Sequence, residues 1–115
     1  MALAVAAGAF GAHGLRNRLD AYSMSVYEKA VFYHFVHALG ILLIALLART
    51  GAITVSGQAR AAWLLLIGVA VFSGSLYALA VSGIRILGAI TPIGGVAFIA
   101  GWLVLAYEAT RVQRP

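Results

Sequence analysis

Mostly apolar residues form three long runs along this chain, over residues 30–48, 61–82 and 86–107. Each run has about 20 residues, the length at which a helix crosses roughly 30 Å of hydrocarbon. Only helices and closed barrels span a bilayer, because its core offers no water to the backbone, and the strands of a barrel would alternate apolar and polar residues. The runs therefore predict three transmembrane helices.

A fourth apolar run covers residues 1–15 and is shorter than the others. At 1.5 Å per residue it reaches about 22 Å, less than the thickness of the hydrocarbon. We expect either a short first helix packed against its neighbours or a helix that begins upstream of Met1, and we favour a missing N-terminal piece. The fold class is thus predicted as an all-α integral membrane protein, a single domain of four transmembrane helices over residues 1–115.

A polar break over residues 16–20 separates the first two runs. The segment 23–29 that follows is expected to be a short interfacial helix or the start of the second transmembrane helix. Ser25 and Glu28 have the spacing of a capping box, in which two side chains satisfy the free N–H groups of a first helical turn. We therefore expect the helix to begin near Ser25.

The two later connections differ in length. Residues 49–60 include several turn-forming residues and predict a loop, whereas residues 82–85 leave room only for a tight hairpin. Pro92 lies early in the last run, next to Thr91. Proline removes a backbone donor and clashes with the preceding turn, so we expect a kink there, with Thr91 satisfying a freed backbone group.

Composition agrees with a chain that lies almost wholly in or beside a membrane. Of its 115 residues, 63% are hydrophobic and 10% are charged, whereas a soluble domain has about 25% charged residues. The absence of cysteine excludes disulfides and thiolate chemistry. Trp63, Trp102 and Tyr107 are expected in the aromatic belts at the membrane surfaces.

The net charge of +5 comes from lysines and arginines that flank the helices. They are expected to contact lipid headgroups, and no basic face with interleaved aromatic residues indicates a nucleic-acid partner. Four spans place Arg49, Arg60, Arg111 and Arg114 on one side and Arg16, Arg18, Lys29 and Arg85 on the other. Because the numbers are equal, the positive-inside rule selects no orientation. A missing N-terminal piece and insertion in both orientations each explain the balance, and we favour the first.

Small residues recur at every fourth position in three of the runs, which places them along one face of each helix. Lipid tails provide no hydrophobic drive for helices to associate, so close approach through small residues stabilises their packing. We expect these stripes to pack within the four-helix bundle, with enough of them for contacts between chains as well. The packing residues are Gly8, Ala12, Ala70, Gly74, Ala78, Ser82, Ala97 and Gly101.

Polar side chains inside the runs mark the candidate site. His34 and His37 are one turn apart on one face of the second helix, and Tyr33 is adjacent to His37. Antiparallel packing of the first two helices is expected to bring His13 to the same place. Ionisable residues within a membrane are costly and usually face the bundle interior. The polar cluster is completed by Ser73, Ser75, Tyr77 and Thr91.

The histidines admit three interpretations. They can be structural groups that hydrogen-bond to the backbone or to hydroxyls of the third helix, which is the interpretation we favour. They can form a proton or solute path, because imidazole titrates near neutral pH. His13, His34 and His37 can also hold a transition metal or haem, but this is the interpretation we favour least, and no metal site is predicted.

No catalytic constellation is found, and the three acids are scattered along the chain. Glu108, at the end of the last run, is expected to be solvated, with Arg111 as a surface partner that contributes little. We therefore expect no enzymatic activity.

The chain resembles a known membrane family in four motifs: GAFGAHGL at residues 8–15, Tyr33 with the triplet 37–39, FSGSLY at 72–77 and LGAITPIGG at 87–95. The family is called domain of unknown function 423 and includes animal transmembrane protein 256. The resemblance implies a small four-helix protein of the bacterial inner membrane, with no established activity and a longer first helix than this chain has. Its motifs coincide with His13, His37, Ser73, Ser75, Tyr77, Thr91 and Pro92.

Three functions remain open. The first is an accessory or structural subunit of a larger membrane complex, with other subunits or a second copy as partners besides the bilayer. The second is a small transporter similar to the small multidrug resistance proteins, with His13 in place of their membrane-embedded glutamate. The third is haem or metal binding by the histidines. We rank them in this order; the cofactor is left unknown, with none expected and bound lipid left open.

Overall fold

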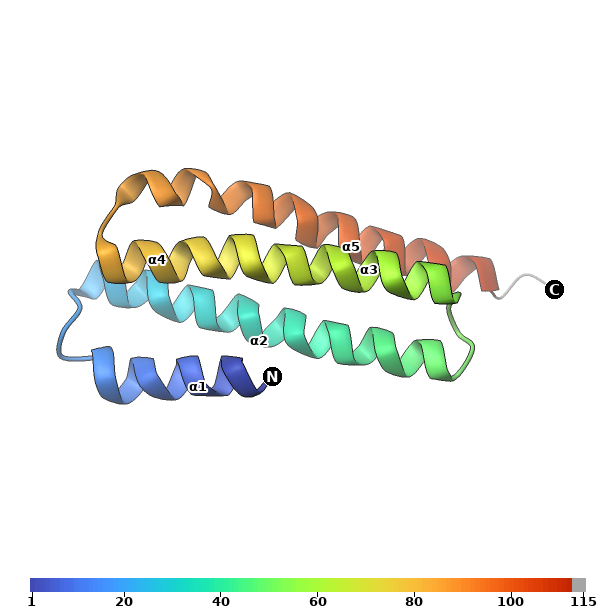
Figure 1. Ribbon diagram of the computed structural model, residues 1–115, viewed down its shortest axis with the longest axis horizontal. Coiled ribbons are helices and arrows are strands. Elements are labelled where there is room, and N and C mark those ends of the chain that lie inside the picture. The colour runs from blue at the N-terminus through green and yellow to red at the C-terminus, as the bar shows by residue number, and fades with distance from the viewer. Residues whose placement is uncertain (113–115) are drawn as a thin grey trace.

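The computed structural model describes residues 1–112, so Arg114 lies outside the described residues. All the regular secondary structure of residues 1–112 is helical, and it forms an elongated bundle of antiparallel rods, 57 × 26 × 15 Å (Figure 1). Three rods, Ala21–Arg49, Val55–Ser82 and Arg85–Arg111, are long and apolar enough to cross a membrane, and Ala2–Leu15 is a shorter apolar helix. The predicted all-α membrane fold is therefore confirmed.

The rods are built from the following elements. The first is α1 (Ala2–Phe10) with the π-helical turn η1 (Gly11–Leu15), and the second is α2 (Ala21–Arg49). The third joins α3 (Val55–Gly68), the π-helical turn η2 (Val69–Ser73) and α4 (Gly74–Ser82), and the last consists of the 3₁₀ helix η3 (Arg85–Ala89) and α5 (Thr91–Val112). Figure 1 shows α1 against α2, with the α3–α4 rod between α2 and α5.

The second helix begins at Ala21, and Asp20 is its N-cap. The Asp20 carboxylate accepts a hydrogen bond from the Ser23 backbone N–H at 2.7 Å, which lowers the pKa of the carboxyl group below its ordinary value. The capping box expected from Ser25 and Glu28 is wrong, because both residues are exposed inside α2. Asp20, five residues before Ser25, satisfies one of the free N–H groups instead.

The last helical segment is interrupted where the sequence predicts a kink. The 3₁₀ helix η3 ends at Ala89 and α5 begins at Thr91, so Pro92 lies in the first turn of α5 rather than inside a continuous helix. A proline is tolerated there because its missing N–H has no helical partner in the first turn. The predicted hairpin before η3 is confirmed: α4 ends at Ser82, and Gly83 has a φ of +72°, a left-handed conformation that favours glycine.

Glycines set the closest contacts between rods. A Cβ atom on Gly94 would lie 2.8 Å from the Cα of Phe72, and one on Gly101 would lie 2.6 Å from Leu65 Cδ2. Of the expected packing residues, Gly101 is buried, Gly8 and Ala97 are half-buried, and Ala12 is exposed. The sequence pattern thus identified only part of the interior glycine set.

The stripe on the α3–α4 rod faces outward. Ala70, Ala78 and Ser82 are exposed, and a Cβ atom on Gly74 would meet nothing within 4 Å. These four residues, which we call the outer stripe, are exposed or, at Gly74, half-buried, and they make no close contact between rods, contrary to expectation. The inward side of the same rod carries Leu65, Ser73 and Leu76 instead.

Candidate functional site

The three histidines do not converge. His37 is buried, and its Nδ1–H donates to the Tyr33 carbonyl at 2.7 Å, whereas His34 Nδ1 lies 3.1 Å from the hydroxyl of Tyr77. His13 is exposed in η1. Within residues 1–112, no group of three or more His, Cys, Asp or Glu side chains is placed to hold a metal ion. The expected meeting of the three imidazoles is therefore wrong.

The hydroxyl groups of the predicted cluster link the rods together. Ser73 is buried at the end of η2, and its hydroxyl donates to the Ala30 carbonyl of α2 at 2.9 Å. Ser75 donates to the Phe72 carbonyl at 3.0 Å and lies 2.6 Å from the Thr91 hydroxyl of α5. The polar groups of the middle rod are thus hydrogen-bonded across two interfaces, which is how buried polar groups are accommodated.

An aromatic cluster surrounds His37 in the middle of the bundle. Its ring stacks on Phe98 with ring centroids 3.5 Å apart, and Tyr33 and Trp102 flank it at 6.0 and 5.8 Å. Trp102 fits over Gly40, where a Cβ atom would lie 2.8 Å from the indole. Trp102 is therefore half-buried against α2. Trp63 and Tyr107 are exposed on the outer surface.

One buried charge was missed by the sequence analysis. Glu108 is fully buried between α5 and the start of α3, where Arg60 Nη2 donates to its Oε1 and Thr54 Oγ1 donates to its Oε2, both at 2.7 Å. The expected solvated Glu108 paired with Arg111 is wrong. Arg111 instead lies over the Tyr107 ring, 5.5 Å from its centroid.

The start of α3 is shaped to receive this carboxylate. Thr54 caps the helix by accepting from the Gly57 N–H at 2.9 Å, and a Cβ atom on Gly57 would lie 2.5 Å from Glu108 Oε2. Thr54, Gly57 and Arg60 are spaced three apart, and Glu108 extends the inward series Phe98, Gly101 and Leu105 of α5. This helical spacing is the sequence signal that would have predicted the pair.

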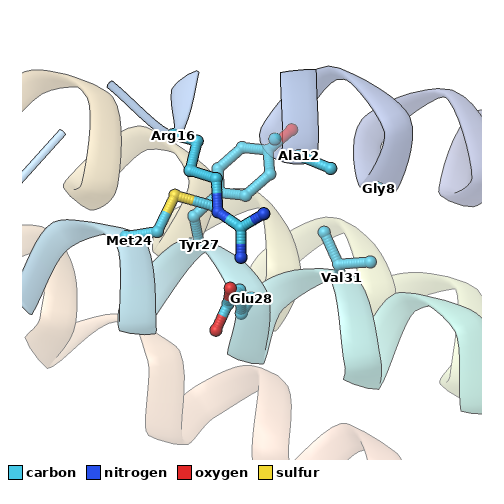
Figure 2. Close-up of a pocket in the computed structure, with 8 residues that line it drawn as sticks. Gly8, Ala12, Arg16, Met24, Tyr27, Glu28 and Val31 are labelled. Atoms are coloured by element: carbon cyan, nitrogen blue, oxygen red, sulfur yellow. The ribbon is translucent and has the colours of Figure 1, made fainter. Parts of the chain in front are cut away.

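The opposite side of the bundle carries an open pair of charges. A pocket of about 170 Å³ lies between α1 and α2, and Arg16 and Glu28 are both part of its lining. Figure 2 shows the Arg16 guanidinium directed toward the Glu28 carboxylate across this pocket. They do not form an ion pair: among residues 1–112 the only one within 4.0 Å joins Arg60 and Glu108.

Comparison with known proteins gives one consistent result. A family model described as "Protein of unknown function (DUF423)" matches residues 7–95. A UPF0382 membrane protein of Staphylococcus saprophyticus is 55% identical over 110 residues, which cover 96% of this chain and 89% of the relative. Another, from Bacillus subtilis, is 46% identical over 113 residues, which cover 95% and 88%. No solved structure matches the chain.

The relatives are named as membrane proteins of bacteria. Their names agree with the three apolar helices of this chain that are long enough to cross a bilayer. The chain is accordingly an integral membrane protein, and neither the names nor the family description assigns an activity.

Proposed function

This chain belongs to the DUF423 family of membrane proteins of unknown function, and from that premise we propose that it is a non-catalytic accessory subunit of a larger membrane complex. The observation that carries the proposal is the outer stripe of Ala70, Gly74, Ala78 and Ser82, which faces away from the chain's own helices. Small residues let two membrane helices approach closely, so the occupant would be a helix of another membrane protein.

The rest of the outward surface differs from the outer stripe. On α2, on α5 and on the α3–α4 rod beside the outer stripe, large aliphatic side chains point outward, as expected of surfaces that contact lipid tails. They include Leu39, Leu42, Leu46, Ile93, Ile99 and Leu103. The contrast supports a helix-contacting role for the outer stripe and a lipid-contacting role for the aliphatic faces.

Transport and cofactor binding have weaker support. A solute path or a metal site needs polar groups that are free to bind, and the ring Nδ1 atoms of His34 and His37 both lie within hydrogen-bond distance of groups in the bundle. His13, the residue that would replace a transporter's glutamate, is exposed in η1. The contacts of the polar cluster favour a structural use.

The test is native mass analysis of the full chain, extracted gently from its own membranes without overexpression. The wild type is expected in an assembly larger than a homodimer. Ala78→Leu fills the outer stripe without touching the interior and should release the chain from that assembly. Ala106→Leu is the matched control, because Ala106 is also an exposed alanine but lies on α5.

Three outcomes would contradict the proposal. Recovery of the wild type as a monomer would show that it has no protein partner in its membrane. Recovery as a homodimer that Ala78→Leu dissociates would make the outer stripe a self-association surface, and the chain would not be a subunit of a larger complex. Equal effects of Ala78→Leu and Ala106→Leu would argue against the outer stripe as the docking surface.

A further inference from the structure

The pocket between α1 and α2 contains opposite charges that do not neutralise each other. Arg16 and Glu28 line it and are both exposed, and neither takes part in an ion pair or a side-chain hydrogen bond within residues 1–112. Their separation leaves a positive and a negative group available to one ligand.

The two helices that wall the pocket, α1 and α2, are fixed against each other. The hydroxyl of Tyr27 donates to the Ala7 carbonyl at 2.6 Å and fixes α1 against α2. Gly11 is buried beneath the Tyr27 ring, which a Cβ atom on Gly11 would strike. The π-helical turn η1 follows immediately and carries the chain to Arg16. Such turns are local distortions that are frequent at functional sites.

The length of α2 places the pocket near the boundary between the lipid headgroups and the hydrocarbon. The 29 residues of α2 extend about 43 Å, so about 7 Å at each end projects beyond 30 Å of hydrocarbon. Glu28 is seven residues into α2, about 10 Å from its start, near the boundary of the hydrocarbon. Gly8 and Val31 line the part of the pocket farther from that end and offer apolar wall to an acyl chain.

We propose that this pocket binds one zwitterionic phospholipid whose headgroup carries a phosphate and a primary amine. Arg16 would hold the phosphate, because guanidinium presents paired N–H donors that match phosphate oxygens. Glu28 would accept hydrogen bonds from the ammonium group. The acyl chains would leave along the apolar wall into the surrounding bilayer.

The pair of charges selects among headgroups. A glycerol headgroup offers Arg16 the same phosphate but gives Glu28 no cation. A choline headgroup has a cation without N–H groups, so it cannot donate hydrogen bonds to the carboxylate. The site lies on α1 and α2, apart from the outer stripe on the α3–α4 rod. The lipid proposal is therefore independent of the proposed subunit role.

The test is native mass spectrometry of the purified full chain in mild detergent with an equimolar mixture of palmitoyl-oleoyl phosphatidylethanolamine, phosphatidylglycerol and phosphatidylcholine. The wild type should retain a single phosphatidylethanolamine about tenfold better than phosphatidylglycerol, since one hydrogen bond to a charged group is worth about a factor of ten. Glu28→Gln should abolish that preference. Arg16→Gln should weaken retention of all three lipids about tenfold, whereas Arg18→Gln, the loss of a nearby exposed arginine, should change nothing.

These variants are expected to fold like the wild type, because the altered side chains are exposed. Equal retention of the three lipids by the wild type would overturn the proposal, as would a phosphatidylethanolamine preference that survives Glu28→Gln. Displacement of the lipid by an equal concentration of free phosphoethanolamine would point to a soluble ligand and would also overturn it. Retention that persists against the free headgroup supports the lipid.

Discussion

The two pairs of arginine and glutamate that this bundle carries near its ends behave in opposite ways. Arg60 and Glu108 meet at 2.7 Å, with the carboxylate buried and bound by Thr54 as well. Arg16 and Glu28 share a pocket without pairing. A buried carboxylate needs its partners, because burying an unpaired charge is expensive, whereas an exposed one can remain available to a ligand. The buried pair of Arg60 and Glu108 is therefore structural, whereas the exposed pair of Arg16 and Glu28 is a candidate binding site.

The largest effect should come from removing the arginine of the closed pair. Arg60→Met leaves the Glu108 carboxylate buried without its cation, and we expect a loss of about 2–3 kcal/mol in the free energy of unfolding. This is less than the roughly 3–5 kcal/mol for a fully buried pair, because 58% of the Arg60 side chain is exposed. Arg16→Met at the open pair should cost less than about 0.5 kcal/mol. Unfolding in detergent, followed by far-UV circular dichroism, measures both.

The two partners of the closed pair should not be equivalent. Glu108→Gln retains a group that Thr54 can bond and leaves an arginine that can turn to water, so its cost should be about 1 kcal/mol. In the double variant the stranded carboxylate is gone, so the combined loss should be smaller than the sum of the single losses. Additive losses, or a larger loss for Glu108→Gln than for Arg60→Met, would contradict the assignment of Glu108 as the buried and dependent partner.

An effect of comparable size is expected at Gly57, the glycine that leaves space for the Glu108 carboxylate. Gly57→Ala would place a methyl group against the Glu108 carboxylate, which Arg60 and Thr54 hold in position. Overpacking of this kind costs about 1–3 kcal/mol. Gly74→Ala is the matched control, because the space beside Gly74 is open and alanine is the better helix former by about 1 kcal/mol.

The measurement is again unfolding of the isolated chain in detergent. Gly57→Ala should destabilise it, while Gly74→Ala should leave it unchanged or more stable. If Gly74→Ala were the more damaging of the two, the outer stripe would have to pack within the chain after all. That result would also remove the basis of the proposed subunit role.

The sequence predicted the architecture well because the membrane imposes it. Length and continuous hydropathy sufficed for the spanning helices, since a helix is the simplest way to satisfy every backbone group in lipid. The direction in which each face points was harder to predict. The outer stripe and Gly101 have the same kind of spacing, yet Gly74 faces open space and Gly101 meets Leu65. Only the packing of neighbouring rods distinguishes them.

The candidate site was predicted in part for a related reason. Ser73, Ser75 and Thr91 do bond between rods, but His13 does not join His34 and His37. Glu108 was assigned to water because it lies near the end of the chain, although its spacing from Leu105 places it on the inward face of α5. Helical phase was the better guide there, and position along the chain was misleading.

The smallest effect is expected at the end of the bundle that carries the open pair, where Asp20 caps α2. Its pKa is lowered because the carboxylate accepts the Ser23 N–H. A lowered pKa in the folded state means that the stabilisation is fully present above the ordinary value of 3.8 and is lost as the pH falls through the lower folded value. The chemical shift of the Ser23 amide proton should therefore titrate below pH 3.8.

Asp20→Asn retains a good N-cap but cannot titrate, so its Ser23 amide shift should be flat over the same range. A wild-type amide that is equally flat would show that Asp20 does not cap the helix.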